Sequence, residues 1–212
     1  MNTFNESSLD GLKEFEKLLE GTHPHSEEII SFLKSKASQG NLITQKMIGF
    51  MYCDGKGVEQ NYYEAFRWYL LSANQGDADS QLRIGWMFQE GNGTGQSDKN
   101  AVKWYRKAAK KGEVNSQYRL GTLYQEGKGT AQSDEDAFKF YLLAAKQGHS
   151  SAQTRLALMY LNGQGTKLDY WEALKWFELA SQQGDEYAKN CYEHMTQAEK
   201  IIESGCYYVT TS

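Results

Sequence analysis

The sequence predicts an all-α solenoid made of four tandem repeats of 36 residues, each forming two helices joined by a turn. Three observations support this class: paired glycines return at a fixed interval, a helix N-cap residue follows each pair, and apolar side chains recur at helical spacing. A period of this length is typical of stacked units, none of which can bury its apolar face alone. The pairs are Gly55 and Gly57, Gly91 and Gly93, Gly127 and Gly129, and Gly163 and Gly165.

The first helix of each repeat should end at the first glycine of a pair. In the third repeat it is predicted over residues 114–126, with Ser116, Leu120 and Tyr124 on its buried side. The first glycine would adopt the left-handed conformation that ends a helix, and the second would keep the return loop flexible. A further glycine inside this helix should lie close to an alanine of the second helix. It recurs at Gly49, Gly85 and Gly121, with Ala157 in the fourth repeat.

The second helix of each repeat begins at a residue whose side-chain oxygen can accept a first-turn amide. These residues are Asn61, Ser97, Ser133 and Asp169. Each helix then carries a small residue, at Ala65, Ala101, Ala137 or Ala173, and a large aromatic, at Trp68, Trp104, Phe140 or Trp176. Glutamines at 45, 81, 117 and 153 are expected to bond backbone groups between units, since strict repetition usually serves packing.

The chain divides into a repeat region and two atypical ends. Residues 1–39 are interpreted as an N-terminal helical cap, a truncated repeat without the paired glycines. Residues 185–212 are interpreted as a C-terminal capping helix, about Glu186 to Glu203, with a tail, because a solenoid needs a polar outer face at its end. The four repeats occupy 40–75, 76–111, 112–147 and 148–184.

The stretches "SQYRLGTLYQEGKG" and "AVKWYRKAAKKG" resemble the Sel1-like repeat family, a relative of the tetratricopeptide repeat. The resemblance implies a right-handed α/α superhelix that binds a protein or peptide, often as an adaptor. Among bacterial members, a small chain of this kind could also act as an inhibitor or immunity-type binder that neutralises a toxin.

Composition limits the other functions. The net charge of -4 gives no general attraction to nucleic acid or to an anionic membrane, and no run of about 18 apolar residues could span a bilayer. Residues 1–12 show no secretory signal, and Cys53, Cys191 and Cys206 lack the spacing of a disulfide framework or zinc site. We therefore expect a cytoplasmic monomer that binds neither nucleic acid nor membrane.

No catalytic constellation or metal site is evident, so the chain is interpreted as a non-enzyme without a cofactor. His23, His25, His149 and His194 are scattered. The alternative is a β-lactam or peptidoglycan hydrolase, an activity reported for cysteine-rich relatives of the family. Ser31 and Lys34 match the serine–lysine pattern of penicillin-recognising enzymes, but no Lys-Thr-Gly motif accompanies them and the cysteines of those relatives are absent.

A basic stripe marks residues 98–111. Its members are Lys99, Lys103, Arg106, Lys107, Lys110 and Lys111. A solvated outer face is the favoured interpretation, with a patch for an acidic partner or nucleic acid as the alternative. Neighbouring helices do not continue the stripe.

The candidate partner-binding residues lie on the side of each first helix opposite its core. They are Phe50, Arg83, Trp86, Arg119, Arg155 and Leu158. The resemblance places this side in the concave groove, where the arginines would form a ladder for an extended peptide and the apolar members would act as anchors. The alternative is that the arginines simply pair with Glu90, Glu126 or neighbouring helices.

Overall fold

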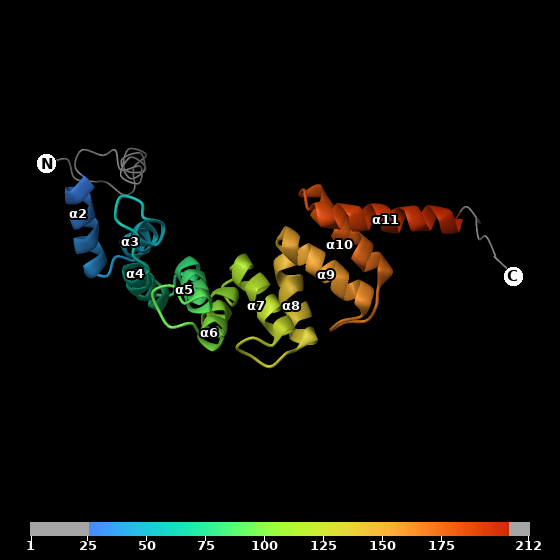
Figure 1. The fold of residues 1–212 in the computed structure, drawn as a ribbon, viewed down its shortest axis with the longest axis horizontal. Coiled ribbons are helices and arrows are strands. Elements are labelled where there is room, and N and C mark those ends of the chain that lie inside the picture. Colours follow the sequence, from blue (N-terminus) through green and yellow to red (C-terminus); the bar gives the residue numbers. More distant parts are fainter. Residues whose placement is uncertain (1–25, 204–212) are drawn as a thin grey trace. The chain divides into compact units, whose positions relative to one another are not determined.

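The computed structural model describes residues 26–203, and all regular secondary structure within that range is α-helical (Figure 1). The predicted all-α class is therefore confirmed. The helices are α2 (Ser26–Ser38), α3 (Leu42–Asp54), α4 (Tyr62–Asn74), α5 (Ala78–Glu90), α6 (Asp98–Ala109), α7 (Val114–Glu126), α8 (Asp134–Lys146), α9 (Ser150–Asn162), α10 (Tyr170–Gln182) and α11 (Glu186–Glu203).

The described residues form two compact units, which divide between Glu113 and Val114. In the first unit α2 packs on α3, α3 on α4, α4 on α5, and α5 on α6. In the second, α7 packs on α8, α8 on α9, α9 on α10, and α10 on α11. Each helix therefore packs mainly on its neighbours in the chain, and this is the packing of an α/α solenoid.

The first helices end as predicted. Gly91 has a φ of 77°, and its amide donates to the Met87 carbonyl, so it forms the left-handed C-cap of α5. Gly55 and Gly163 end α3 and α9 in the same way, with φ of 68° and 64°. The helix after each loop is also capped as predicted, because the side chains of Asn61, Ser97, Ser133 and Asp169 accept backbone amides of the first turn.

The second glycine of a pair adopts the left-handed conformation, with φ of 70° at Gly93 and 64° at Gly165, and at these two positions it is also needed for space, which we did not predict. A Cβ on Gly93 would lie 2.1 Å from the carbonyl oxygen of Tyr62, at the start of α4. A Cβ on Gly165 would lie at the same distance from the carbonyl oxygen of Asp134, at the start of α8. The obstacle is backbone in both loops, so each loop lies directly against the second helix of the preceding repeat.

The glycine inside the first helix faces an aromatic ring, not the alanine that we predicted. A Cβ on Gly85 would lie 2.6 Å from ring carbons of Tyr105. Gly49 faces Tyr69 and Gly121 faces Tyr141 in the same way. These tyrosines are buried, whereas Trp68, Trp104 and Phe140, one position earlier, are only half-buried. In these repeats the buried aromatic residue is therefore the tyrosine that packs against the glycine of the first helix.

The fourth repeat changes three linked positions together. Tyr105 and Tyr141 donate their hydroxyls to Gln89 and Gln125, at 2.9 and 3.0 Å. The equivalent residues of the fourth repeat are Phe177 and Leu161, and the glycine is Ala157. In the fourth repeat the ring of Phe177 thus has no hydroxyl to donate, Leu161 offers no acceptor, and Ala157 adds a methyl group where the other repeats have glycine. Ala157 and Phe177 are both fully buried.

The recurrent glutamines bond backbone groups between helices, as expected. Gln45, Gln81 and Gln153 each donate to a carbonyl of the preceding helix, those of Ala37, Ala73 and Ala145, at 2.9 to 3.2 Å. A second glutamine extends this arrangement at three places. Gln75 donates to Gln45, Gln147 to Gln117, and Gln183 to Gln153, at 2.7 to 2.8 Å.

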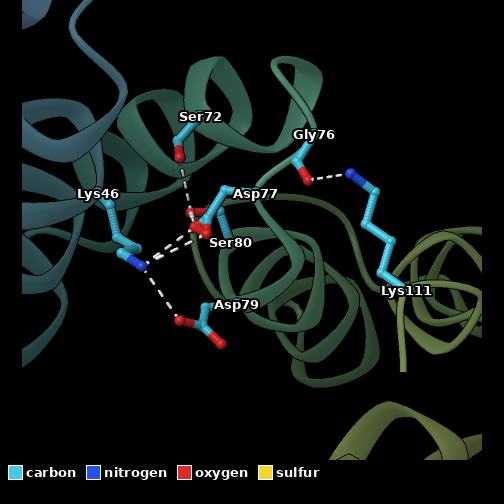
Figure 2. Close-up of polar contacts among 7 residues, drawn as sticks. All are labelled: Lys46, Ser72, Gly76, Asp77, Asp79, Ser80 and Lys111. Carbon is cyan, nitrogen blue, oxygen red and sulfur yellow. Dashed lines mark hydrogen bonds and ion pairs between the residues drawn. The ribbon is translucent and has the colours of Figure 1, made fainter. Parts of the chain in front are cut away.

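Lys111 breaks this glutamine series. It occupies the position of Gln75, Gln147 and Gln183, and its ammonium group donates to the Gly76 carbonyl (Figure 2). The Oε1 atom of Gln81, which a glutamine at 111 would meet, is buried without a hydrogen-bond partner. The junction at Gln81 therefore lacks one side-chain hydrogen bond that the other three junctions have.

The described ends are helical. Helix α11 spans the predicted range, with Ala188 fully buried and the Tyr170 hydroxyl of α10 donating to the Met195 carbonyl at 2.8 Å. Within residues 26–203, no helix is both long and apolar enough to cross a bilayer. Residues 1–25, which include His23 and His25, and the tail 204–212 lie outside the described residues.

Candidate functional site

The three arginines of the predicted surface lie on three of the first helices. Arg83 lies on α5, Arg119 on α7 and Arg155 on α9, and all three are exposed. None of them forms an ion pair within the part of the chain that the structure describes. Glu126, the alternative partner considered for Arg119, pairs instead with Lys128 at 2.9 Å. Three guanidinium groups are therefore available to an external acceptor.

The apolar members of the predicted surface are half-buried. Trp86 meets the edge of the Tyr62 ring, with ring centroids 6.4 Å apart, and packs on the core of the first unit. Phe50 packs on the same core and lies below the Lys56 ammonium, 5.9 Å from its ring centroid. Leu158 packs on the core of the second unit. Each contributes to its unit's packing and leaves only part of its side chain at the surface.

A polar cluster fixes the start of α5 against α3 and α4 (Figure 2). Lys46 Nζ lies 3.2 Å from the Asp77 carboxylate and 3.1 Å from that of Asp79. Ser80 donates to Ser72 at 2.9 Å. Burial lowers the pKa of Lys46, but its hydrogen bonds to Asp79 and Asp77 and their negative charges outweigh this, so the pKa is raised overall. The cluster positions α5, and with it the turn that carries Arg83.

In the second unit, the residues at the repeat positions of Lys46 and Asp77 also connect one first helix to the start of the next, by ring stacking or by a hydrogen bond. The ring of Tyr118 on α7 stacks on His149 at the start of α9, with centroids 4.5 Å apart. The hydroxyl of Thr154 on α9 donates to Asp185 before α11, at 2.8 Å. Successive first helices are thus tied together beside the arginines, which limits how far Arg119 and Arg155 can separate.

Sequence reasoning missed the apolar side chains exposed on the second helices and their loops. Tyr63 and Leu71 lie on α4, Leu143 on α8, and Trp171 and Leu179 on α10. Leu168, in the loop before α10, and Trp171 are each 68% exposed. A signal was present, because Leu71, Leu143 and Leu179 recur at one repeat position outside the core pattern.

The residues considered for catalysis do not form a reactive group. Ser31 is exposed on α2, and Lys34 Nζ lies over the Tyr52 ring, 5.3 Å from its centroid, without a hydrogen bond to Ser31. Burial, with the charge of Asp54, raises the pKa of the Cys53 thiol to about 11, which disfavours the nucleophilic thiolate. Within residues 26–203, no group of three or more His, Cys, Asp or Glu side chains could hold a metal ion.

Tandem helix pairs that bury one face and expose the other define a helical-repeat protein, a class that offers open surface for binding. The sequence model of the Sel1 repeat family matches residues 44–77, 78–113, 114–149 and 150–185. The chain therefore belongs to the Sel1 repeat family, as its resemblance predicted. Sel1 repeat proteins generally mediate protein–protein interactions, and the family is mostly non-catalytic.

Solved structures agree with this assignment. The chain is similar to a protective antigen present in uropathogenic Escherichia coli strains, with 28% identity, a TM-score of 0.81, and coverage of 93% of this chain and 42% of that one. It thus spans less than half of that protein's length. A Sel1 repeat protein from Oxalobacter formigenes has 31% identity and a TM-score of 0.76, over 85% of this chain and 73% of that one.

A more distant structure shows likeness of fold alone. An immunity protein from Pseudomonas aeruginosa has 18% identity and a TM-score of 0.51, over 88% of this chain and 71% of that one. Among curated proteins, none matches the chain.

Proposed function

We propose that this chain is a scaffold that binds a protein partner through the exposed sides of its first helices. The arginines Arg83, Arg119 and Arg155 would contact carboxylates or backbone carbonyls of the partner. Phe50, Trp86 and Leu158 would add apolar contact through their exposed parts. Arginine beside aromatic and aliphatic side chains is the composition of binding hot spots.

One observation carries the proposal. Basic side chains at one repeated position of the second helices pair with an acid three residues earlier, at Arg67 with Glu64, Lys139 with Asp136 and Lys175 with Glu172. Arg83, Arg119 and Arg155 are also exposed but form no ion pair among the described residues. A guanidinium group binds a carboxylate through two parallel hydrogen bonds, so unpaired arginines favour recognition of an acidic or extended partner segment.

The test begins with a partner captured from the native lysate and then purified. Titration calorimetry would compare the wild type with Arg119→Ala/Arg155→Ala, which alters the second unit alone. If these arginines are hot spots, affinity should fall by about 2 kcal/mol or more, on the order of thirtyfold. The matched control is Arg67→Ala, an exposed arginine on a second helix, which should leave affinity within about twofold.

Two outcomes would contradict the proposal. Unchanged affinity in a folded double variant would move the site away from the first helices. Turnover of a β-lactam by the wild type, lost on Ser31→Ala, would favour the hydrolase alternative. A toxin-neutralising inhibitor is one form of the proposed scaffold, and inhibition of the captured partner's activity would support that form.

A further inference from the structure

The outer face of α6 differs from the same face of α4, α8 and α10. In those three helices an acid and a base three residues later form an ion pair, at 2.9 to 3.1 Å. In α6 the acid is replaced by Asn100, and the base is Lys103. Lys103 has no ion-pair partner within residues 26–203. The second repeat has therefore lost the anion that balances this position in the other repeats.

A second repeated position changes in the same direction. Leu71, Leu143 and Leu179 are exposed on the other three helices, and α6 has Lys107 at that position. Lys99 and Lys110 extend the charge toward the two ends of the helix, and neither has an ion-pair partner among the described residues. Asp98 is the acidic residue in the first turn of α6. The outer face of α6 thus carries more positive charge than the same face of α4, α8 and α10, and fewer acidic side chains neutralise that charge.

The basic side chains surround an open hollow of about 460 Å³. It is lined by Lys103, Trp104, Arg106, Lys107 and Lys110. Lys107 Nζ lies 3.8 Å from the centroid of the Trp104 ring, and Trp104 packs partly on the core of the first unit. A fixed aromatic ring thus holds one ammonium group at the edge of the hollow.

This arrangement has an electrostatic cost that the other repeats avoid. Lys99, Lys103 and Lys107 follow one another at intervals of four residues, and like charges at that spacing destabilise a helix. A bound anion would offset that repulsion, because it attracts each of the ammonium groups. We propose that the outer face of α6 binds an acidic segment of a protein partner, with its carboxylates at Lys103, Lys107 and Lys110.

The extent of the face favours an acidic peptide over nucleic acid. The 12 residues of α6 span about 18 Å, which five or six residues of an extended peptide would cover. A nucleic acid strand carries negative charge well beyond that length. Elsewhere on the first unit its phosphates would meet exposed acidic residues, Asp79 and Glu90, rather than further lysines. The site is on a second helix, so it is distinct from the proposed surface of the first helices and does not depend on it.

Fluorescence anisotropy with a labelled ten-residue peptide of alternating glutamate and serine tests this proposal on the full chain. Lys103→Ala/Lys110→Ala should weaken binding tenfold or more. The matched control, Lys139→Ala/Lys146→Ala, removes two lysines from the same repeat positions of α8 and should change affinity less than twofold. Circular dichroism would establish that both variants keep their helix.

A third variant restores the missing acid without removing any lysine. Asn100→Glu should pair with Lys103, as Glu64 pairs with Arg67, and should weaken peptide binding several-fold. Equal losses of peptide affinity in the α6 and α8 variants would show that the effect depends only on net charge, and would overturn the proposal. So would equal binding of a glutamine–serine peptide, tighter binding of a ten-residue oligothymidine at the same salt concentration, or no detectable binding by the wild type.

Discussion

The ring of Tyr141 lies so close to Gly121 that a Cβ on the glycine would be 2.6 Å from ring carbon Cδ1. The hydroxyl of the same tyrosine reaches Gln125 at 3.0 Å and Thr122 at 3.2 Å. One side chain thus joins α8 to α7 by both packing and hydrogen bonds. The same contact forms between Gly85 and Tyr105, so it links the two helices of both the second and the third repeat.

Gly121→Val should destabilise the protein, although valine forms helix slightly better than glycine. The added atoms must displace the buried Tyr141 ring, and overpacking of this kind costs about 1–3 kcal/mol. Guanidinium denaturation measures the effect. The control is Gly95→Ala, since a Cβ at Gly95 has no atom within 4 Å and should leave stability unchanged or slightly raised. A midpoint that stays constant or rises in Gly121→Val would remove the close-contact argument.

Lys111→Gln should stabilise the second repeat. The new amide can donate to Gln81 Oε1, which is buried without a hydrogen-bond partner, as Gln147 donates to Gln117. A satisfied hydrogen bond of this kind contributes about 0.5–1.5 kcal/mol to the free energy of unfolding. The reverse change, Gln147→Lys, should lower stability by a similar amount. Thermal unfolding of both variants decides, and a loss of stability in Lys111→Gln would contradict the assignment.

Tyr141 should make stability fall at alkaline pH. Burial raises the pKa of Tyr141 to about 12 from its ordinary value of 10.0, although its bond to Thr122 acts in the opposite direction. Above pH 10 the unfolded chain releases this proton while the folded chain keeps it. This group's contribution to stability is thus complete below pH 10 and is lost as the pH rises toward 12.

The Tyr141→Phe variant tests that prediction. It should be less stable at pH 7 by about 1 kcal/mol, because hydrogen bonds are lost. Between pH 10 and pH 11.5 its stability should fall less steeply than that of the wild type, by at most about 1.4 kcal/mol per pH unit. Tyr63→Phe, at a residue 61% exposed, is the control and should leave the slope unchanged. Parallel curves for the wild type and Tyr141→Phe would refute the prediction.

Ala188→Glu should detach α11 from α10 if residues 185–212 act as a cap. Ala188 is fully buried, and a carboxylate cannot remain there without a partner. Detachment would expose apolar surface of α10, so we expect faster proteolysis after residue 185 and lower solubility. Lys189→Glu, at the exposed neighbouring residue, should change neither. A soluble, protease-resistant Ala188→Glu variant would show that the segment is not needed as a cap.

Local features of the sequence determined the helices. The left-handed C-caps at Gly55 and Gly91 and the N-caps at Asn61 and Ser97 were all predictable. Each depends on groups within about four residues of one another, so the residue type alone indicates the backbone conformation. The repeat period then fixed the order of the helices and the solenoid class.

Tertiary contacts decided which residues meet. Whether Gly85 faces Ala101 or Tyr105 depends on the rotation of α6 about its axis, which the period does not specify. The lack of space for a side chain at Gly93 arises from the Tyr62 carbonyl, about 30 positions earlier in the chain. Whether Arg119 is paired depends on where Lys128 directs Glu126. The two glycine contacts join groups about 20 and 30 residues apart in the chain, whereas a repeat pattern encodes only the spacing along the chain.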